Sequence, residues 1–145
     1  MLKIRPLAEG DHAEWRRLWT LYLAFYETKL PEEIYATYWK RLLGDDPQDF
    51  HGLIAEQDGK PIGLTHYVFH RHGWKIENTC YLQDLYVDKS VRGAGAGRAL
   101  IEAVYAAADA AGCPSVYWLT QDFNATARRL YDRIANKTPF IVYRR

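Results

Sequence analysis

Three alternating glycines, Gly93, Gly95 and Gly97, stand between Arg92 and Arg98, immediately before an alanine-rich stretch that is typical of a helix. Glycine has no side chain, so successive backbone N–H groups can close around an anion at these positions. The N-terminal dipole of the following helix and the two arginines add positive charge at the same place. The residues therefore predict a strand, a loop and a helix that together hold a phosphate group.

Two common phosphate-binding loops do not fit these residues. A P-loop opens its helix with Gly-Lys followed by Ser or Thr, whereas Gly97 is followed by Arg98 and Ala99. The dinucleotide fingerprint Gly-x-Gly-x-x-Gly would need its third glycine at Arg98 or Leu100. A glycine-rich helix start that binds nothing is the remaining alternative. We expect a phosphate loop instead, because alternating glycines are costly in conformational entropy.

A third pattern, Arg/Gln-x-x-Gly-x-Gly/Ala, is met by Arg92, Gly95 and Gly97, and with it the chain resembles the GNAT superfamily of N-acetyltransferases. The resemblance runs from about Leu2 to Tyr143. It implies that acetyl-CoA is the co-substrate, that the loop grips its pyrophosphate, and that the preceding strand pairs its backbone with the pantetheine arm. The residues that it assigns to acetyl-CoA binding are Leu85, Tyr86, Val87, Arg92, Gly93, Ala94, Gly95, Ala96, Gly97, Arg98 and Asn124.

A second segment adds to the resemblance. The residues from Asn124 to Tyr131 are similar to the superfamily's Asn-x-x-Ala-x-x-Leu-Tyr helix, and a short apolar strand over Ser115–Leu119 precedes them. In the superfamily this tyrosine reaches the sulfur of CoA, so the resemblance implies that Tyr131 is the general acid. A phenol suits that task because its O–H can hydrogen-bond or protonate the thiolate that leaves as the amine attacks.

Two departures from the superfamily affect the mechanism. The segments 81–87, 114–118 and 138–144 look most similar to the histone and polyamine acetyltransferases and their bacterial relatives, which usually carry Glu at the position of Gln83. An amide side chain cannot accept a proton as a base. Ala135 and Asn136 also replace the usual Gly-Phe after the tyrosine helix. A non-catalytic acyl-CoA-binding domain therefore stays open as an alternative to an enzyme.

The acceptor amine must lose a proton, and Asp84 is the nearest titratable candidate for a catalytic base. Side chains alternate along a strand, so Gln83 and Asp84 are expected on opposite faces. A structural, hydrogen-bonded carboxylate is the alternative role for Asp84. The resemblance implies that the two N-terminal helices frame the acceptor, which makes Glu27, Glu33 and Gln83 candidates for substrate binding. The aromatic residues of these helices that we expect in the core are Trp19, Tyr22 and Trp39.

Three histidines lie close together in the sequence, so a metal site has to be considered. His66 and His70 fall on one face of a predicted strand, and His72 lies just beyond it. Side chains four residues apart on a strand are roughly 13 Å apart, which is too far to share one ion. We therefore expect no metal, while a water-linked base among these histidines stays open.

Length and composition limit the remaining classes. The chain has 145 residues and a net charge of +1, with cysteines at Cys80 and Cys113 that show no paired spacing. The length suits a single domain over residues 1–145. Near-neutral charge argues against a dedicated nucleic-acid binder. Without a signal peptide or a long apolar run, we expect a cytoplasmic protein with no membrane partner.

The hydrophobic pattern predicts an α+β fold with a mixed central sheet flanked by helices, as in the GNAT (acyl-CoA N-acyltransferase) fold. Strands are expected at about 2–6, 50–57, 61–70, 80–87, 115–119 and 139–143. Helices are expected at about 11–26, 31–43, 97–112 and 124–131. The last strand would be an apolar edge, so we expect it to pair or exchange between two chains of a homodimer.

These residues and the resemblance together predict an acetyl-CoA-dependent N-acetyltransferase. It would transfer the acetyl group directly to a primary amine of a small molecule, which is polyamine-like or amino-acid-like. A lysine of a protein or histone tail is the alternative acceptor.

Overall fold

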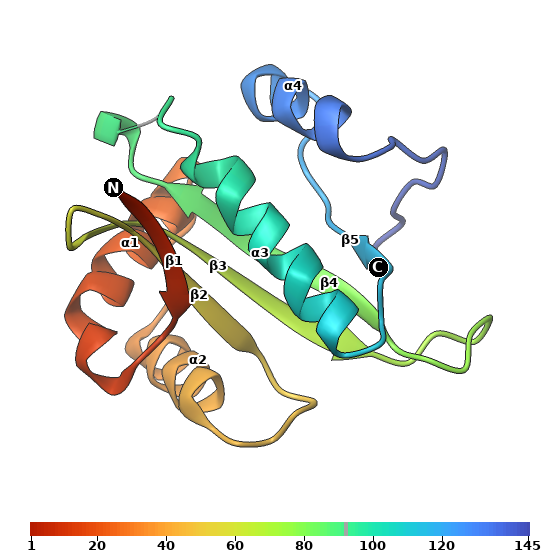
Figure 1. Cartoon of the computed structure of the whole chain (residues 1–145), viewed down its shortest axis with the longest axis horizontal. Coiled ribbons are helices and arrows are strands. Elements are labelled where there is room, and N and C mark those ends of the chain that lie inside the picture. The colour runs from red at the N-terminus through yellow and green to blue at the C-terminus, as the bar shows by residue number, and fades with distance from the viewer. Residues whose placement is uncertain (92) are drawn as a thin grey trace.

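The computed structural model describes residues 1–91 and 93–145, and a five-stranded sheet with the order β1-β2-β3-β4-β5 lies at its centre (Figure 1). The strands are β1 (Leu2–Pro6), β2 (His51–Gln57), β3 (Lys60–His70), β4 (Thr79–Val87) and β5 (Val116–Tyr117). The helices are α1 (His12–Phe25), α2 (Glu32–Leu43), α3 (Ala96–Ala110) and α4 (Ala125–Ile134), with short 3-10 turns at Glu9–Asp11 and Lys89–Val91. Neighbouring strands are antiparallel except β4 and β5, which are parallel. The predicted α+β class with a mixed sheet is confirmed.

Turns and helix ends lie where the sequence signals place them. Asp58 and Gly59 join β2 to β3 with φ of 52° and 82°, as a tight hairpin turn requires. Pro31 directly precedes α2, and Gly112, with φ of 72°, follows α3. These ends fix the lengths of the helices that cover the sheet.

Helices cover both faces of the sheet, and each face has its own apolar core (Figure 1). α3 buries Leu100 on one face, whereas α1 buries Trp15 and Leu18 on the other. Ile54 and Ala55 of β2 enter different cores, because successive side chains of a strand point to opposite faces. The face that a β4 side chain occupies therefore decides which helices it meets.

A β-bulge in β4 changes which residues share a face. His66 of β3 pairs with Asp84, and the next β3 residue pairs with Leu82, so Gln83 is the extra residue of the bulge. Leu82 and Leu85 both pack on the α3 side, although strict alternation would separate them. Gln83 and Asp84 consequently both face α1 and α2, where they line one pocket. The expectation that they lie on opposite faces is wrong, because alternation fails across a bulge.

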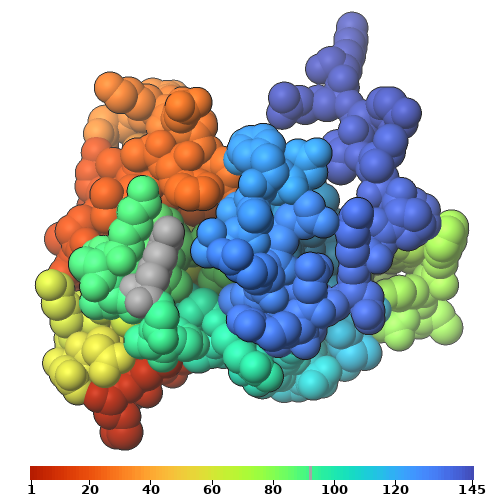
Figure 2. Space-filling view, turned by 90° about the horizontal axis from the view of Figure 1, so that it is seen from above, coloured from red at the N-terminus to blue at the C-terminus, as the bar shows by residue number. Residues whose placement is uncertain are grey.

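The C-terminal part of the sheet is shorter than the sequence predicts. β5 spans only Val116–Tyr117 and pairs with Cys80 and Tyr81 of β4. The described chain forms no strand over residues 139–143, so that predicted strand is wrong for the single chain. An extended segment needs a partner strand for its backbone groups, and β5 is too short to supply one. Figure 2 shows this end of the chain, in dark blue, projecting from the body of the protein.

No helix within residues 1–91 and 93–145 is both long enough and apolar enough to cross a membrane.

Candidate active site

The glycine loop and the start of α3 form an anion-binding geometry. Gly93 and Gly95 have φ of 97° and 83°, a conformation that other residues adopt only with strain. Gly95 caps α3, and the Ala99 N–H donates the first helical hydrogen bond to the Gly95 carbonyl. The N–H groups of Ala96 and Gly97 precede that ladder and point out of the helix end. This arrangement suits a pyrophosphate, which needs several N–H donors and the helix dipole.

Two arginines flank the loop glycines. Arg92 lies outside the described residues. Arg98 is exposed, and its Nε donates to Oε1 of Glu102 at 3.0 Å, one turn further along α3. Ala94 is exposed between the two positive-φ glycines. Arg98 can therefore reach an anion at the helix end by exchanging one exposed carboxylate for another negative group, at little energetic cost.

β4 extends past β5 toward the glycine loop. Because β5 pairs only with Cys80 and Tyr81, the predicted pantetheine-binding residues lie on the part of β4 beyond that pairing. Leu85 and Val87 pack against the α3 core, whereas Tyr86 is buried in the α1 core. A 3-10 turn over Lys89–Val91 follows the end of β4 and leads toward the glycine loop.

Tyr131 lies on α4, partly buried beside the core under α3. Its ring meets Trp118 edge-on, with 5.3 Å between ring centroids. A Cβ at Gly97 would lie 3.6 Å from Leu130, so α4 packs directly against the start of α3. Burial, with a smaller contribution from Tyr26, raises the pKa of Tyr131 to about 12. The phenol therefore keeps its proton at neutral pH and can act as a donor.

Asn124 precedes the first turn of α4. Its Nδ2 donates to Oγ1 of Thr120 at 3.3 Å, and its side chain does not cap the helix. The structure therefore gives Asn124 a local contact in the loop before α4.

Asp84 is 5% exposed and accepts two hydrogen bonds at one oxygen. The Tyr38 hydroxyl donates to Oδ2 at 2.6 Å, and Nδ1 of His66 lies 2.7 Å from the same oxygen. Burial acts to raise the pKa of Asp84, but His66, and to a smaller extent the hydrogen bonds from Tyr38 and Tyr22, outweigh it, so the pKa lies below its usual range. Asp84 is consequently an anion at neutral pH.

His66 is neutral in this arrangement. The Trp15 indole N–H donates to Nε2 of His66 at 2.9 Å, and an indole nitrogen can only donate. Nε2 must therefore be unprotonated, which leaves the proton on Nδ1, where it is donated to Asp84. The buried charge of Asp84 is thus held by uncharged partners, and a cation brought beside it would be strongly favoured.

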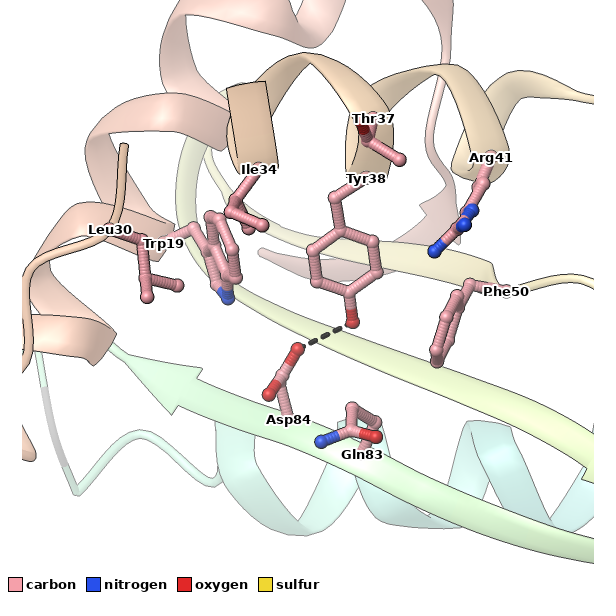
Figure 3. A pocket seen from close by; sticks show the side chains of 9 residues that line it. All are labelled: Trp19, Leu30, Ile34, Thr37, Tyr38, Arg41, Phe50, Gln83 and Asp84. Carbon is pink, nitrogen blue, oxygen red and sulfur yellow. Dashed lines mark hydrogen bonds between the residues drawn. The ribbon is translucent and has the colours of Figure 1, made fainter. Parts of the chain in front are cut away.

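A pocket of about 220 Å³ opens between α1, α2 and β4 at Asp84 (Figure 3). Its lining residues are Trp19, Leu30, Ile34, Thr37, Tyr38, Arg41, Phe50, Gln83 and Asp84. Trp19 is 4% exposed, and its Nε1 is the one buried side-chain polar atom of the described residues without a hydrogen-bond partner. The aromatic walls and the anionic floor suit an organic ammonium group.

Some of the residues predicted to bind the acceptor line this pocket, and others do not. Gln83 and Asp84 line it, whereas Glu27 and Glu33 are exposed and do not. Trp19, expected in the core, is buried and also lines the pocket. Sequence reasoning missed six further lining residues, which are Leu30, Ile34, Thr37, Tyr38, Arg41 and Phe50. Spacings of three and four along α2 could have revealed a polar stripe on its inner face.

The other histidines have separate environments. Nε2 of His70 lies 2.7 Å from the Tyr117 hydroxyl, and Nδ1 of His72 accepts from the Trp74 N–H at 3.1 Å. Among the residues that the structure describes, no group of three His, Cys, Asp or Glu side chains could hold a metal ion.

Comparisons with known proteins agree with this geometry. A model described as the acetyltransferase (GNAT) family matches residues 15–135. The D-amino-acid N-acetyltransferase HPA3 of Saccharomyces cerevisiae (strain ATCC 204508 / S288c) is 37% identical over 144 residues, covering 98% of this chain and 89% of HPA3. The thialysine N-epsilon-acetyltransferase of Bos taurus is 33% identical over 139 residues, covering 88% of this chain and 79% of that protein.

A solved structure gives the same fold. The aminoglycoside acetyltransferase AAC(6')-Iy, in complex with the bisubstrate analog CoA-S-monomethyl-acetylneamine, superposes with a TM-score of 0.84. The match covers 100% of this chain and 97% of that one at 20% identity. Similarity at this level concerns the fold alone.

Proposed function

Because the chain belongs to the acetyltransferase (GNAT) family, we propose that it transfers the acetyl group of acetyl-CoA directly to the primary amine of a small molecule. The observation that carries the proposal is the pocket at Asp84, where a buried carboxylate whose hydrogen-bond donors are uncharged meets aromatic walls. The printed activities of the two relatives, acting on D-amino acids and thialysine, support a small amine as acceptor. A pocket of about 220 Å³ suits such a ligand.

Acetyl-CoA fits the residues that would hold it. We assign its pyrophosphate to the backbone of Gly93–Gly97, with Arg92 and Arg98 supplying charge, and its pantetheine arm to Leu85–Val87. The free N–H groups at the start of α3 and the positive φ of two loop glycines support this assignment. When bound, acetyl-CoA supplies a thioester carbon that the neutral amine attacks and a thiolate that leaves.

Tyr131 is our candidate for the acid. Its raised pKa keeps the phenol protonated, so its O–H can hydrogen-bond the negative charge on the leaving sulfur. The packing of α4 against the start of α3 supports this role, because it brings the helix of Tyr131 beside the loop assigned to CoA.

Asp84 is our candidate for the group that receives the amine. Its charge draws an ammonium ion into the pocket, and the low pKa makes it a weak proton acceptor. We therefore expect Asp84 to bind and orient the amine, whose proton leaves to water at the pocket mouth. Gln83, on the same face, can hydrogen-bond the amine without competing for its proton.

We also propose a cytoplasmic homodimer. Phe140, Ile141, Val142 and Tyr143 are 66–90% exposed in the single chain, and burial of such a run against a second chain would remove apolar surface from water. Cys80 and Cys113 are free thiols, which is consistent with a reducing compartment.

A thiol-release assay with acetyl-CoA tests the proposed reaction. Polyamines, D- and L-amino acids, aminoglycosides and a histone-tail peptide would be offered as acceptors, and mass spectrometry would identify the N-acetylated product. We expect release with at least one small amine. Release with the peptide alone would transfer the proposal to a protein acceptor, and silence across the panel despite measurable CoA binding would contradict an N-acetyltransferase.

A further inference from the structure

The pocket at Asp84 has a second, opposite charge. Arg41 lines it from the last turn of α2, and Figure 3 shows its guanidinium reaching down into the pocket beside Phe50. No carboxylate of the described residues lies within ion-pair distance of Arg41. One small cavity therefore carries a buried anion on its floor and an unpaired cation on its wall. A ligand with both an ammonium and a carboxylate group would satisfy both.

Trp19 supplies an independent sign of an acceptor oxygen. Its Nε1–H is buried without a partner and, in Figure 3, points toward the β4 side of the pocket near Asp84. An indole N–H can only donate, so neither an ammonium ion nor a hydrocarbon can satisfy it. A buried unsatisfied donor is unfavourable in the folded chain, and a hydrogen bond to an oxygen atom of a ligand would remove that penalty.

The rest of the lining is apolar or aromatic. Leu30, Ile34 and Phe50 join the rings of Trp19 and Tyr38 around the two charged groups. These walls suit an aliphatic or aromatic side chain. A polyamine fits less well, because its second ammonium would meet the positive charge of Arg41 in the same cavity.

We propose that the pocket selects α-amino acids with apolar or aromatic side chains as acetyl acceptors, with the amine at Asp84 and the carboxylate held by Arg41. This inference rests on the proposed function and makes Arg41 the residue that separates amino acids from simple amines. Charge-assisted hydrogen bonds to a guanidinium fix a carboxylate in orientation as well as in place. The amine is thereby directed toward β4, where the acetyl group is expected.

The test compares D- and L-phenylalanine with phenethylamine, which has the same ring and amine but lacks the carboxylate. Thiol release gives kcat/KM for the wild type, Arg41→Gln, Arg41→Lys and Lys40→Gln, the last being a neighbouring exposed cation outside the pocket. Calorimetry measures phenylalanine binding to the same proteins with CoA bound. Circular dichroism verifies that each variant is folded.

We expect at least one enantiomer of phenylalanine to be preferred over phenethylamine. Arg41→Gln should lower kcat/KM for it by about 10- to 100-fold and change that for phenethylamine less than about threefold. Arg41→Lys should recover part of the loss, and Lys40→Gln should match the wild type.

Two results would overturn the inference. The amino-acid selectivity would be wrong if phenethylamine or spermidine has a kcat/KM equal to that of phenylalanine, or if Arg41→Gln lowers kcat/KM equally for all amines. The proposed acetyl transfer would be unaffected by either result. If no amine causes thiol release, calorimetry still shows whether phenylalanine binds in the pocket. Binding of phenylalanine that depends on Arg41 would support this pocket while the proposed reaction fails, and no binding would remove both.

Discussion

Asp84 is a carboxylate that the fold buries among uncharged donors. The Tyr38 hydroxyl and the Nδ1–H of His66 donate to one of its oxygens. The Trp15 N–H donates to Nε2 of His66 and thereby fixes the tautomer of the ring. Such a group costs solvation energy that the hydrogen bonds recover only in part. Because this charge lies at the pocket floor, we expect an ammonium ion to bind there, and we expect His66 to position Asp84 through its hydrogen bond.

Tyr131→Phe tests the proposed acid at the scale of one atom. The variant keeps the ring against Trp118 and removes only the O–H. We expect kcat to fall by about 100-fold, because the donor to the leaving sulfur is lost, while the Kd for acetyl-CoA changes little. Stopped-flow thiol release and calorimetry would measure the two quantities. Tyr143→Phe, at an exposed position, is the matched control, and unchanged turnover in Tyr131→Phe would remove this residue from the mechanism.

The pH dependence of kcat/KM tests both groups together. The pKa of Asp84 is lowered, so its charge is present above that pKa and is lost only as the pH falls through it, below the range in which a free aspartate titrates. Tyr131, with a pKa of about 12, stays protonated at higher pH. From about pH 6 to pH 10 neither group titrates, so the rate should rise with the neutral fraction of the amine and show no falling limb.

Two amines of different pKa would make this comparison. The rising limb should shift by the difference between their pKa values. A limb at a fixed pH for both amines would indicate an enzyme base that titrates in that range, which contradicts the role given to Asp84.

At the scale of elements, the site depends on where β4 breaks its regular pairing and where α3 begins. The bulge at Gln83 turns two successive side chains toward the α1–α2 face, and two glycines with positive φ precede the start of α3, where we propose that an anion binds. Both devices are local departures from ideal geometry. The glycine loop is expected to respond to a single added methyl group.

Gly95→Ala should weaken CoA binding beyond its effect on stability. Gly95 and Gly59 have φ of 83° and 82°, and a Cβ at either would meet nothing within 4 Å, so both alanine variants should lose a similar 1–2 kcal/mol, about the usual cost of this conformation. Only the Gly95 methyl would occupy the proposed phosphate site. We expect calorimetry to give a Kd for CoA raised by about tenfold or more in Gly95→Ala and unchanged in Gly59→Ala. Equal CoA affinity in the two variants would argue against a phosphate at this loop.

Gly63→Ala should destabilise the β3–β4 pairing. A Cβ there would lie 2.9 Å from the Tyr86 carbonyl oxygen, and backbone cannot move aside as a side chain can. We expect urea unfolding to show a loss of about 1–3 kcal/mol. Gly73→Ala, in a loop with open space around the position, serves as the control and should differ little from the wild type. A Gly63→Ala variant as stable as the wild type would mean that the strands separate more easily than the register suggests.

Local sequence signals predicted most elements, because helix caps, the Asp58-Gly59 turn and apolar periodicity act over a few residues. They did not predict the bulge, since a register shift depends on which β3 residue meets which β4 residue. The same limit applies to the site. The glycine loop is contiguous in the sequence, so it could be recognised there. The contributions of Tyr38 and Arg41 to the pocket arise only when α2 packs over β4.

At the scale of the whole molecule, the chain leaves an apolar C-terminal segment without a strand partner. The segment around Phe140 to Tyr143 was expected to form an edge strand and has no strand neighbour within the described chain. Sequence patterning could identify its β-forming character and could not supply its partner. A second copy of the protein would provide one.

Light scattering at micromolar concentration tests this assembly. We expect a mass of twice the 16.9 kDa of the chain, and we expect a variant lacking residues 138–145 to have the mass of a single chain. Burial of the apolar segment is the physical reason for the difference. A monomeric full-length protein would contradict the proposed dimer and leave the chemistry of the pocket unaffected.

The measurement that tests the central claim most directly is kcat/KM for a small primary amine in the wild type and in Asp84→Asn, with acetyl-CoA saturating. Asp45→Asn, an exposed carboxylate change outside the pocket, is the control, and thermal unfolding verifies the fold. We predict a loss of about 100-fold in Asp84→Asn, since a buried ion pair with the amine disappears, together with an unchanged Kd for CoA. An Asp84→Asn enzyme that is folded and fully active would show that the amine is received elsewhere.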